Sequence, residues 1–162
     1  MQIVKSPLEL VDFILLDAEY RVIVPELGVD PDFTEVFDQY GIDMDYAIQP
    51  KQTIPGELLV FVRCAINCAE EPLPGYRLFI EGVGHFKSDG RGDVSDDDWQ
   101  TLLRGSALGI VINSLRVIGM QLTAQGPFGK YVLPSVDLND LHQKKAEAYQ
   151  QQKAPRRRKK KE

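Results

Sequence analysis

SDDDWQTLLRGSALGIVINSLRVIGMQLTAQ, residues 95–125, is the stretch that decides the fold of this chain. Ser95 followed by Asp98 is typical of a helix N-terminus, because the serine hydroxyl can accept a hydrogen bond from the Asp98 amide. Gly126 and Pro127 end the helical pattern. The stretch therefore predicts one long helix, roughly 40 Å in length at about 1.5 Å per residue.

Two apolar stripes run along this predicted helix. The first has the spacing of a helix packed on a core, and it consists of Trp99, Leu103, Ala107, Ile110, Val111, Ser114, Ile118 and Leu122. No charged residue lies between Arg104 and Arg116, so a second stripe can face a partner subunit. The predicted oligomer interface consists of Leu108, Ile112, Leu115 and Arg116. A membrane span is disfavoured, since Arg116 near its centre would cost about 2.5–3.5 kcal/mol.

Several segments have the composition and alternation of β-strands. Residues 9–24 are rich in strand-forming side chains, and residues 44–52 form a weaker strand that suits a sheet edge. Residues 57–69 and 76–86 alternate between two faces. Because strands come first and helices last, we expect an α+β fold with an antiparallel sheet covered by helices on one face.

The connector at residues 25–43 combines helix-breaking residues with the aromatic side chains Phe33, Phe37 and Tyr40. Two interpretations remain open. The connector can form a short helix that packs these aromatics on the core, or it can form one wall of an apolar binding groove. A shorter helix is expected near the C-terminus, ending before Pro155.

Charge is distributed unevenly over the 162 residues. Residues 155–162 carry six Lys and Arg against one Glu, or +5, so the net charge of −5 leaves −10 on residues 1–154. We therefore predict one acidic domain, residues 1–154, and a disordered basic tail, residues 155–162. The acidic body argues against a folded nucleic-acid-binding face. No apolar leader follows the N-terminus, which predicts a cytoplasmic protein.

Residues with catalytic or metal-binding chemistry are few and scattered. Cys64 and Cys68 lie on one predicted strand, roughly 13 Å apart, which is too far for a disulfide. His85 and His142 have no evident partner for catalysis or metal ligation. We expect no enzyme activity, no catalytic residue, no cofactor and no metal site.

Three segments in the second half of the chain, taken in order, resemble one known family. They are GVGHF at residues 82–86, NSLR at residues 113–116, and GPFGKYVLPSVDLNDL at residues 126–141. The SecB protein-export chaperone family has a strand ending in Gly-x-Phe, then an interface helix with an arginine, then Gly-x-Phe followed by Leu-Pro-x-Val-Asp. The chain is similar to this family over roughly residues 57–142.

This resemblance implies a four-stranded antiparallel sheet with a long helix and a shorter C-terminal helix. The family assembles as a homotetramer, a dimer of dimers, through the long helix. Its members are ATP-independent holdases that keep unfolded or secretory polypeptides in apolar grooves, a mode of binding that tolerates many sequences. We assign the groove residues of this chain by the helices, strand and connector that correspond to those lining the groove in the family. The resemblance implies Phe33, Phe37, Tyr40, Tyr46, Ile48, Leu138 and Leu141.

The resemblance leaves the partner open. Family members dock the SecA motor partly through acidic residues of the sheet, where this chain has Phe79 and Glu81. The family also contains chaperones attached to toxin–antitoxin systems, which hold an exposed segment of an antitoxin. SecA and an antitoxin are therefore alternative partners beside general clients. Contact with nucleic acid or the ribosome through the basic tail is a further alternative.

Overall fold

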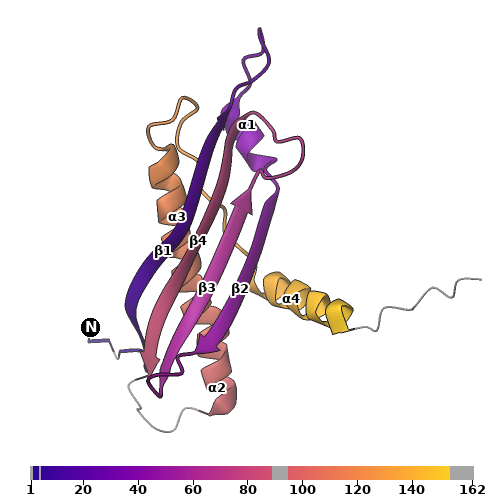
Figure 1. Ribbon diagram of the computed structural model, residues 1–162. Coiled ribbons are helices and arrows are strands. Elements are labelled where there is room, and N and C mark those ends of the chain that lie inside the picture. Colours follow the sequence, from indigo (N-terminus) through magenta and orange to yellow (C-terminus); the bar gives the residue numbers. More distant parts are fainter. Residues whose placement is uncertain (1, 4, 89–94, 154–162) are drawn as a thin grey trace, which may run out of the picture.

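The computed structural model describes residues 2, 3, 5–88 and 95–153, which contain one antiparallel sheet. Its strands are β1 (Leu8–Ile23), β2 (Ile42–Pro50), β3 (Glu57–Ile66) and β4 (Gly75–Ser88), in the spatial order β1-β4-β3-β2 (Figure 1). The predicted α+β fold with a four-stranded antiparallel sheet is confirmed, and β2 lies at an edge as expected. The predicted basic tail, residues 155–162, lies outside the described residues.

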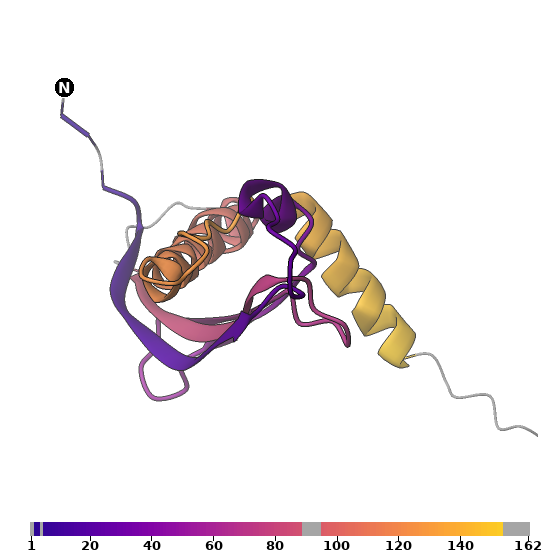
Figure 2. The same ribbon diagram turned by 90° about the horizontal axis from the view of Figure 1, so that it is seen from above.

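The described helices lie on one face and at one edge of this sheet. α1 (Phe33–Asp38) is the short helix in the connector between β1 and β2. α2 (Asp96–Thr101), η1 (Leu102–Ala107) and α3 (Leu108–Thr123) form one continuous helix, and α4 (Leu138–Lys153) follows at the C-terminus. Figure 2 shows α3 lying in the concave face of the twisted sheet, with α4 extending outward at the side away from β1.

β1 contains two bulges, which explain why both alternating sets of its side chains are apolar. Its pairing with β4 shifts register between Leu10 and Asp12 and again between Leu15 and Asp17. Each bulge adds one residue and so moves the following side chains to the opposite face. The residues of β1 that pair with the helix-facing positions of β4 therefore change from an even number to odd numbers at the first bulge and back to even numbers at the second. They are Leu10, then Phe13 and Leu15, then Ala18, Tyr20 and Val22.

Gly82 and Gly84 of β4 let the long helix approach the sheet closely. A Cβ atom on Gly84 would lie 2.6 Å from the side chain of Val111, and one on Gly82 would lie 3.1 Å from that of Leu115. Because the strand offers bare backbone at these positions, both side chains of α3 reach the centre of the core. The GVG pattern of the sequence thus provides the space for the helix.

The long helix contains one π-helical turn, η1, which sequence reasoning did not predict. Such a turn holds one extra residue, so side chains after it are displaced by one position around the helix axis. Before the turn, Trp99 packs against the core as expected, and within the turn Leu103 and Ala107 are buried as expected. After it, Val111 is buried as predicted, whereas Ile110 is 38% exposed. Leu115, Gly119 and Thr123 are buried one residue after the predicted Ser114, Ile118 and Leu122, although Ile118 and Leu122 are also partly buried against the core.

This displacement corrects the predicted oligomer interface. Leu108, Ile112 and Leu115 are 0, 3 and 1% exposed within the single chain, and all three belong to its core. They are therefore not available to a partner subunit, and the prediction is wrong for these three residues. Arg116, the fourth predicted interface residue, instead binds the backbone of the segment that follows the helix.

The outward face of α3 remains uncovered and apolar. Ile110 is 38% exposed and Val117 is 46% exposed, while a Cβ atom on Gly109 would meet only open space. By length and composition alone, residues 97–123 could cross a membrane, a test that core helices of soluble proteins also pass. Here Val111 and Leu115 of this helix pack on the sheet, as a core helix does.

Candidate functional site

Residues 124–137, which we call the return segment, connect the end of α3 to α4. Arg116 holds this segment by donating to the carbonyl oxygens of Leu133 at 2.8 Å and Pro134 at 3.0 Å. The hydroxyl of Thr123 accepts a hydrogen bond from the Tyr131 amide at 3.0 Å. These three bonds attach an otherwise irregular segment to a rigid helix, so the side chains that it carries are held in place.

Two adjacent hollows border the return segment. The first hollow, of about 570 Å³, lies between α1 and the return segment. The second, of about 660 Å³, lies between β2, the return segment and α4. Ile42 and Pro134 line both hollows, so the two hollows are adjacent. We refer to the two together as the groove.

Aromatic side chains form the wall of the first hollow. Phe33 of α1 stacks on Phe128 of the return segment with ring centroids 4.1 Å apart, and Phe37 meets Tyr131 edge-on at 5.5 Å. The Tyr40 hydroxyl makes hydrogen bonds of 2.7 and 2.8 Å to backbone groups at the start of β4. Such rings offer a large apolar area that loses little conformational freedom on binding.

The tyrosines of this wall are uncharged at physiological pH. Burial raises the pKa of Tyr131 well above its ordinary value, and burial also raises that of Tyr40. The Tyr131 hydroxyl is buried and has no hydrogen-bond partner among the described residues. The aromatic part of this wall is therefore uncharged and has one unused hydrogen-bonding group beneath it, while Asp38 and Lys130 also line the hollow.

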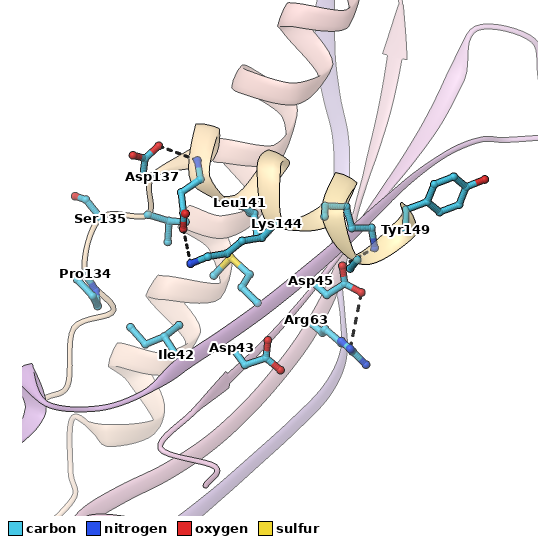
Figure 3. Close-up of a pocket in the computed structure, with 15 residues that line it drawn as sticks. Ile42, Asp43, Asp45, Arg63, Pro134, Ser135, Asp137, Leu141, Lys144 and Tyr149 are labelled. Atoms are coloured by element: carbon cyan, nitrogen blue, oxygen red, sulfur yellow. Dashed lines mark hydrogen bonds and ion pairs between the residues drawn. The ribbon is translucent and has the colours of Figure 1, made fainter. Parts of the chain in front are cut away.

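α4 closes the second hollow and is attached to β2 through polar contacts. Lys145 lies 2.5 Å from the Asp45 carboxylate, and the Tyr46 hydroxyl lies 2.8 Å from Nδ1 of His142. Figure 3 shows Arg63 directed at the same carboxylate, at 3.8 Å. Burial acts to raise the pKa of Asp45, but the hydrogen bonds it accepts from Lys145 and the Tyr46 amide, with the nearby positive charges, lower it overall.

Apolar side chains from three elements line the second hollow between these charges. Ile42 and Met44 come from β2, Val136 from the return segment, and Leu141 and Tyr149 from α4. β2 pairs with β3 on one side only among the described strands. Because consecutive residues of β2 line the hollow, the unpaired edge of the strand borders it with free backbone groups.

The structure brings together only part of the groove predicted from the sequence. The predicted residues that line it are Phe33, Phe37, Tyr40 and Leu141. The others pack against the core without lining either hollow: Tyr46, Ile48 and Leu138.

Sequence reasoning missed the contribution of the return segment, which supplies Phe128, Tyr131, Pro134 and Val136. A signal for it is present, because the segment places apolar side chains next to glycine and lysine in an extended stretch. Within the described part of the chain, no group of three or more His, Cys, Asp or Glu side chains could hold a metal ion.

No protein-family model matches this sequence, and no curated protein sequence matches it either. Among solved structures, the chain is similar to the SecB-like chaperone Rv1957 of Mycobacterium tuberculosis, in complex with a ChAD peptide from the HigA1 antitoxin. The TM-score is 0.57 and the identity 12%, over 80% of this chain and 91% of that chain. A protein of unknown function from Streptococcus agalactiae is more weakly similar, with a TM-score of 0.39 and 7% identity over 80% of this chain and 97% of that chain.

The architecture places this chain in a class of α+β proteins. In this class a long helix lies in the concave face of a four-stranded antiparallel sheet, and here a groove lies at the β2 edge. The particular fold is SecB-like, in agreement with the resemblance seen in the sequence.

Proposed function

We propose that this protein is an ATP-independent holdase that binds extended, apolar segments of unfolded polypeptides in the groove. The observation that carries the proposal is that the two hollows adjoin at Ile42 and Pro134, and we infer that they form one trough. Either hollow alone suits a few side chains, whereas a continuous trough suits an extended segment. A wall of aromatic rings binds apolar side chains without requiring one sequence.

Backbone contacts with the client would add affinity that is independent of its sequence. The free edge of β2 borders the second hollow over Ile42, Asp43, Met44 and Asp45. An extended segment can pair with such an edge as an added strand, while every second side chain enters the groove. This mode explains how one site can hold many unfolded chains.

A dedicated chaperone for one antitoxin is the second candidate. It is favoured by the structurally similar Rv1957, which was solved with a peptide from an antitoxin. Competition binding separates the two functions. A general holdase binds unrelated unfolded proteins with affinities within roughly tenfold, about 1.4 kcal/mol, whereas a dedicated chaperone prefers one segment by much more. Delivery of secretory clients to SecA, and action in the cytoplasm, remain predictions.

We further propose a dimer of dimers that uses two surfaces other than the interface predicted from the sequence. One is the outward face of α3, where Ile110 and Val117 are exposed. The other is β1, an edge strand whose Val11, Ile14 and Leu16 side chains are exposed. An exposed apolar edge strand favours pairing with another chain, and uncovered apolar faces favour association.

Suppression of aggregation tests the holdase proposal. A chemically unfolded client is diluted into buffer without nucleotide, and light scattering is measured with the wild-type protein and two variants. Val132→Asp places a charge in the first hollow at an exposed position, so the fold should survive, and it is expected to reduce suppression. Leu27→Asp, at an exposed position that does not line the groove, is the matched control and should act like the wild type. Absence of suppression by the wild-type protein at equimolar ratio would overturn the proposal.

A further inference from the structure

The convex face of the sheet carries two arginines directly opposite each other. Arg21 of β1 pairs in register with Arg77 of β4, and both line a depression of about 230 Å³. Cross-strand neighbours have Cβ atoms only about 4.5–5.5 Å apart, and like charges at that distance destabilise a sheet. The pair therefore lowers the stability of the chain unless something binds to it.

Neither arginine forms a direct ion pair within the described part of the chain, although Glu19 lines the same depression. No ion pair or side-chain hydrogen bond joins Arg21 or Arg77 to another described residue. Arg63 of the neighbouring strand β3 differs, since it lies 3.8 Å from the Asp45 carboxylate. The two guanidinium groups beside the depression are thus available to an anionic ligand.

The lining of the depression also contains apolar side chains. Phe79, Ala65 and Cys68 line it together with the two arginines. A guanidinium group binds a carboxylate through two parallel hydrogen bonds, a geometry that a planar acid satisfies. A ligand that fills the depression must therefore combine a carboxylate with a neighbouring apolar group.

The surrounding charges select against a polyanion. Glu19 lines the same depression, and the next row of the sheet places Asp17 opposite Glu81. That row is roughly 7 Å from Glu19 along the strands and roughly 14 Å from the two arginines, so it acts on a ligand that extends beyond the depression and not on one confined to it. A nucleic acid carries a charge on every nucleotide and would be repelled by these carboxylates. An isolated carboxylate beside an apolar side chain avoids this repulsion.

We propose that this depression is a docking site for an acidic segment of a partner protein, in which a glutamate or aspartate adjoins an apolar residue. Arg21 and Arg77 share the carboxylate, and the apolar side chain covers Phe79. No residue lines both this site and the groove, so the docking site is separate from client binding and does not depend on it.

Cys68 reports occupancy of the site, because its partly exposed thiol lines the depression. Cys64 is an internal control, since it is 1% exposed and burial raises the pKa of its thiol to about 12. The 162-residue protein is treated with N-ethylmaleimide in the presence of a peptide that has one glutamate flanked by leucines. A second peptide has glutamine in place of glutamate. Mass spectrometry follows the labelling of each cysteine.

The glutamate peptide is expected to slow the labelling of Cys68 severalfold, and the glutamine peptide to leave it unchanged. The double variant Arg21→Gln, Arg77→Gln should lose this protection and yet unfold at a higher denaturant concentration, because a like-charge repulsion is removed. A purely structural role for the arginines would instead lower that concentration.

Three results would overturn the proposal. The first is equal protection of Cys68 by both peptides, and the second is stronger protection by an RNA oligonucleotide than by the glutamate peptide. The third is a changed oligomeric mass of the double variant without peptide, which would identify a second copy of this chain as the occupant.

Discussion

Truncation of Leu115 tests the phase of the long helix, because the π-helical turn places this side chain in the core. Leu115 is 1% exposed and lies over Gly82, which has no side chain that could fill the vacated space. Buried Leu→Ala changes cost about 2.7–5 kcal/mol, and the cost rises with the cavity that remains. We expect Leu115→Ala to cost about 4–5 kcal/mol, which lowers Tm by roughly 8–20 °C for a domain of this size.

Val117→Ala is the matched control on the same helix, since Val117 is 46% exposed. Guanidinium unfolding is followed by circular dichroism at a low and a high protein concentration. At the low concentration Val117→Ala should stay within about 0.5 kcal/mol of the wild type. At the high concentration it should lose stability relative to the wild type, because association stabilises the fold by mass action. A large cost for Val117→Ala at both concentrations, with little cost for Leu115→Ala, would refute the reasoning.

Three further predictions concern the sheet, the helix cap and α4. Gly84→Ala is expected to destabilise the fold by about 1–3 kcal/mol, because the added methyl group would lie 2.6 Å from Val111; an unchanged Tm would mean that α3 stands further from the sheet. Ser95→Ala removes the hydrogen bond of 3.2 Å from the Asp98 amide and should cost about 1 kcal/mol in denaturant unfolding, and a neutral result would contradict the cap. Folding lowers the pKa of Asp45 from its ordinary value of 3.8. The Asp45 carboxylate therefore stabilises the docking of α4, by about 0.2–1 kcal/mol, at neutral pH, and this stabilisation is lost as the pH falls below 3.8. The opening of α4, measured by hydrogen exchange, should therefore become more frequent in acid, and Asp45→Asn should make it more frequent already at pH 7. Opening that changes neither with pH nor with this substitution would show that Asp45 does not hold α4.

Local patterns were sufficient to predict the strands and the start of the long helix. The side chains of residues 57–69 alternate between two faces without interruption. Because one face is buried, a shift of the strand by one residue would expose its core side chains. The start of the helix depends on two residues close in sequence, Ser95 and Asp98, whose hydrogen bonds are local. Both features could be predicted because no distant contact is needed to produce them.

Single inserted residues change the phase of two elements, β1 and the long helix, and in the helix they account for the error of the prediction. The bulges of β1 reverse the faces of the strand, and one extra residue in η1 rotates the following helix by about 100°. Whether such an insertion forms depends on tertiary packing, here on the fit of Val111 and Leu115 over the glycines of β4. Trp99, before the insertion, was therefore assigned correctly to the core. After the insertion, Ser114 was assigned to the core stripe, where the structure has Leu115.

The groove was predicted only where its residues belong to one local element. The aromatics of α1 and its flank lie close together in the sequence, so their shared role could be inferred. The return segment reaches the groove because Arg116 binds its backbone 17 and 18 residues further along the chain, and no periodic pattern encodes that contact.

Site-specific photo-crosslinking tests the binding of unfolded segments in the groove most directly. Benzoylphenylalanine replaces Val132, whose exposed side chain lines the first hollow, or Leu27, which is exposed and lines neither hollow. With an unfolded client and no nucleotide, we predict crosslinks at position 132 that a second unfolded protein competes away, and only background crosslinking at position 27. Equal crosslinking at the two positions, or crosslinking at position 132 that is as strong with the folded client, would contradict the account.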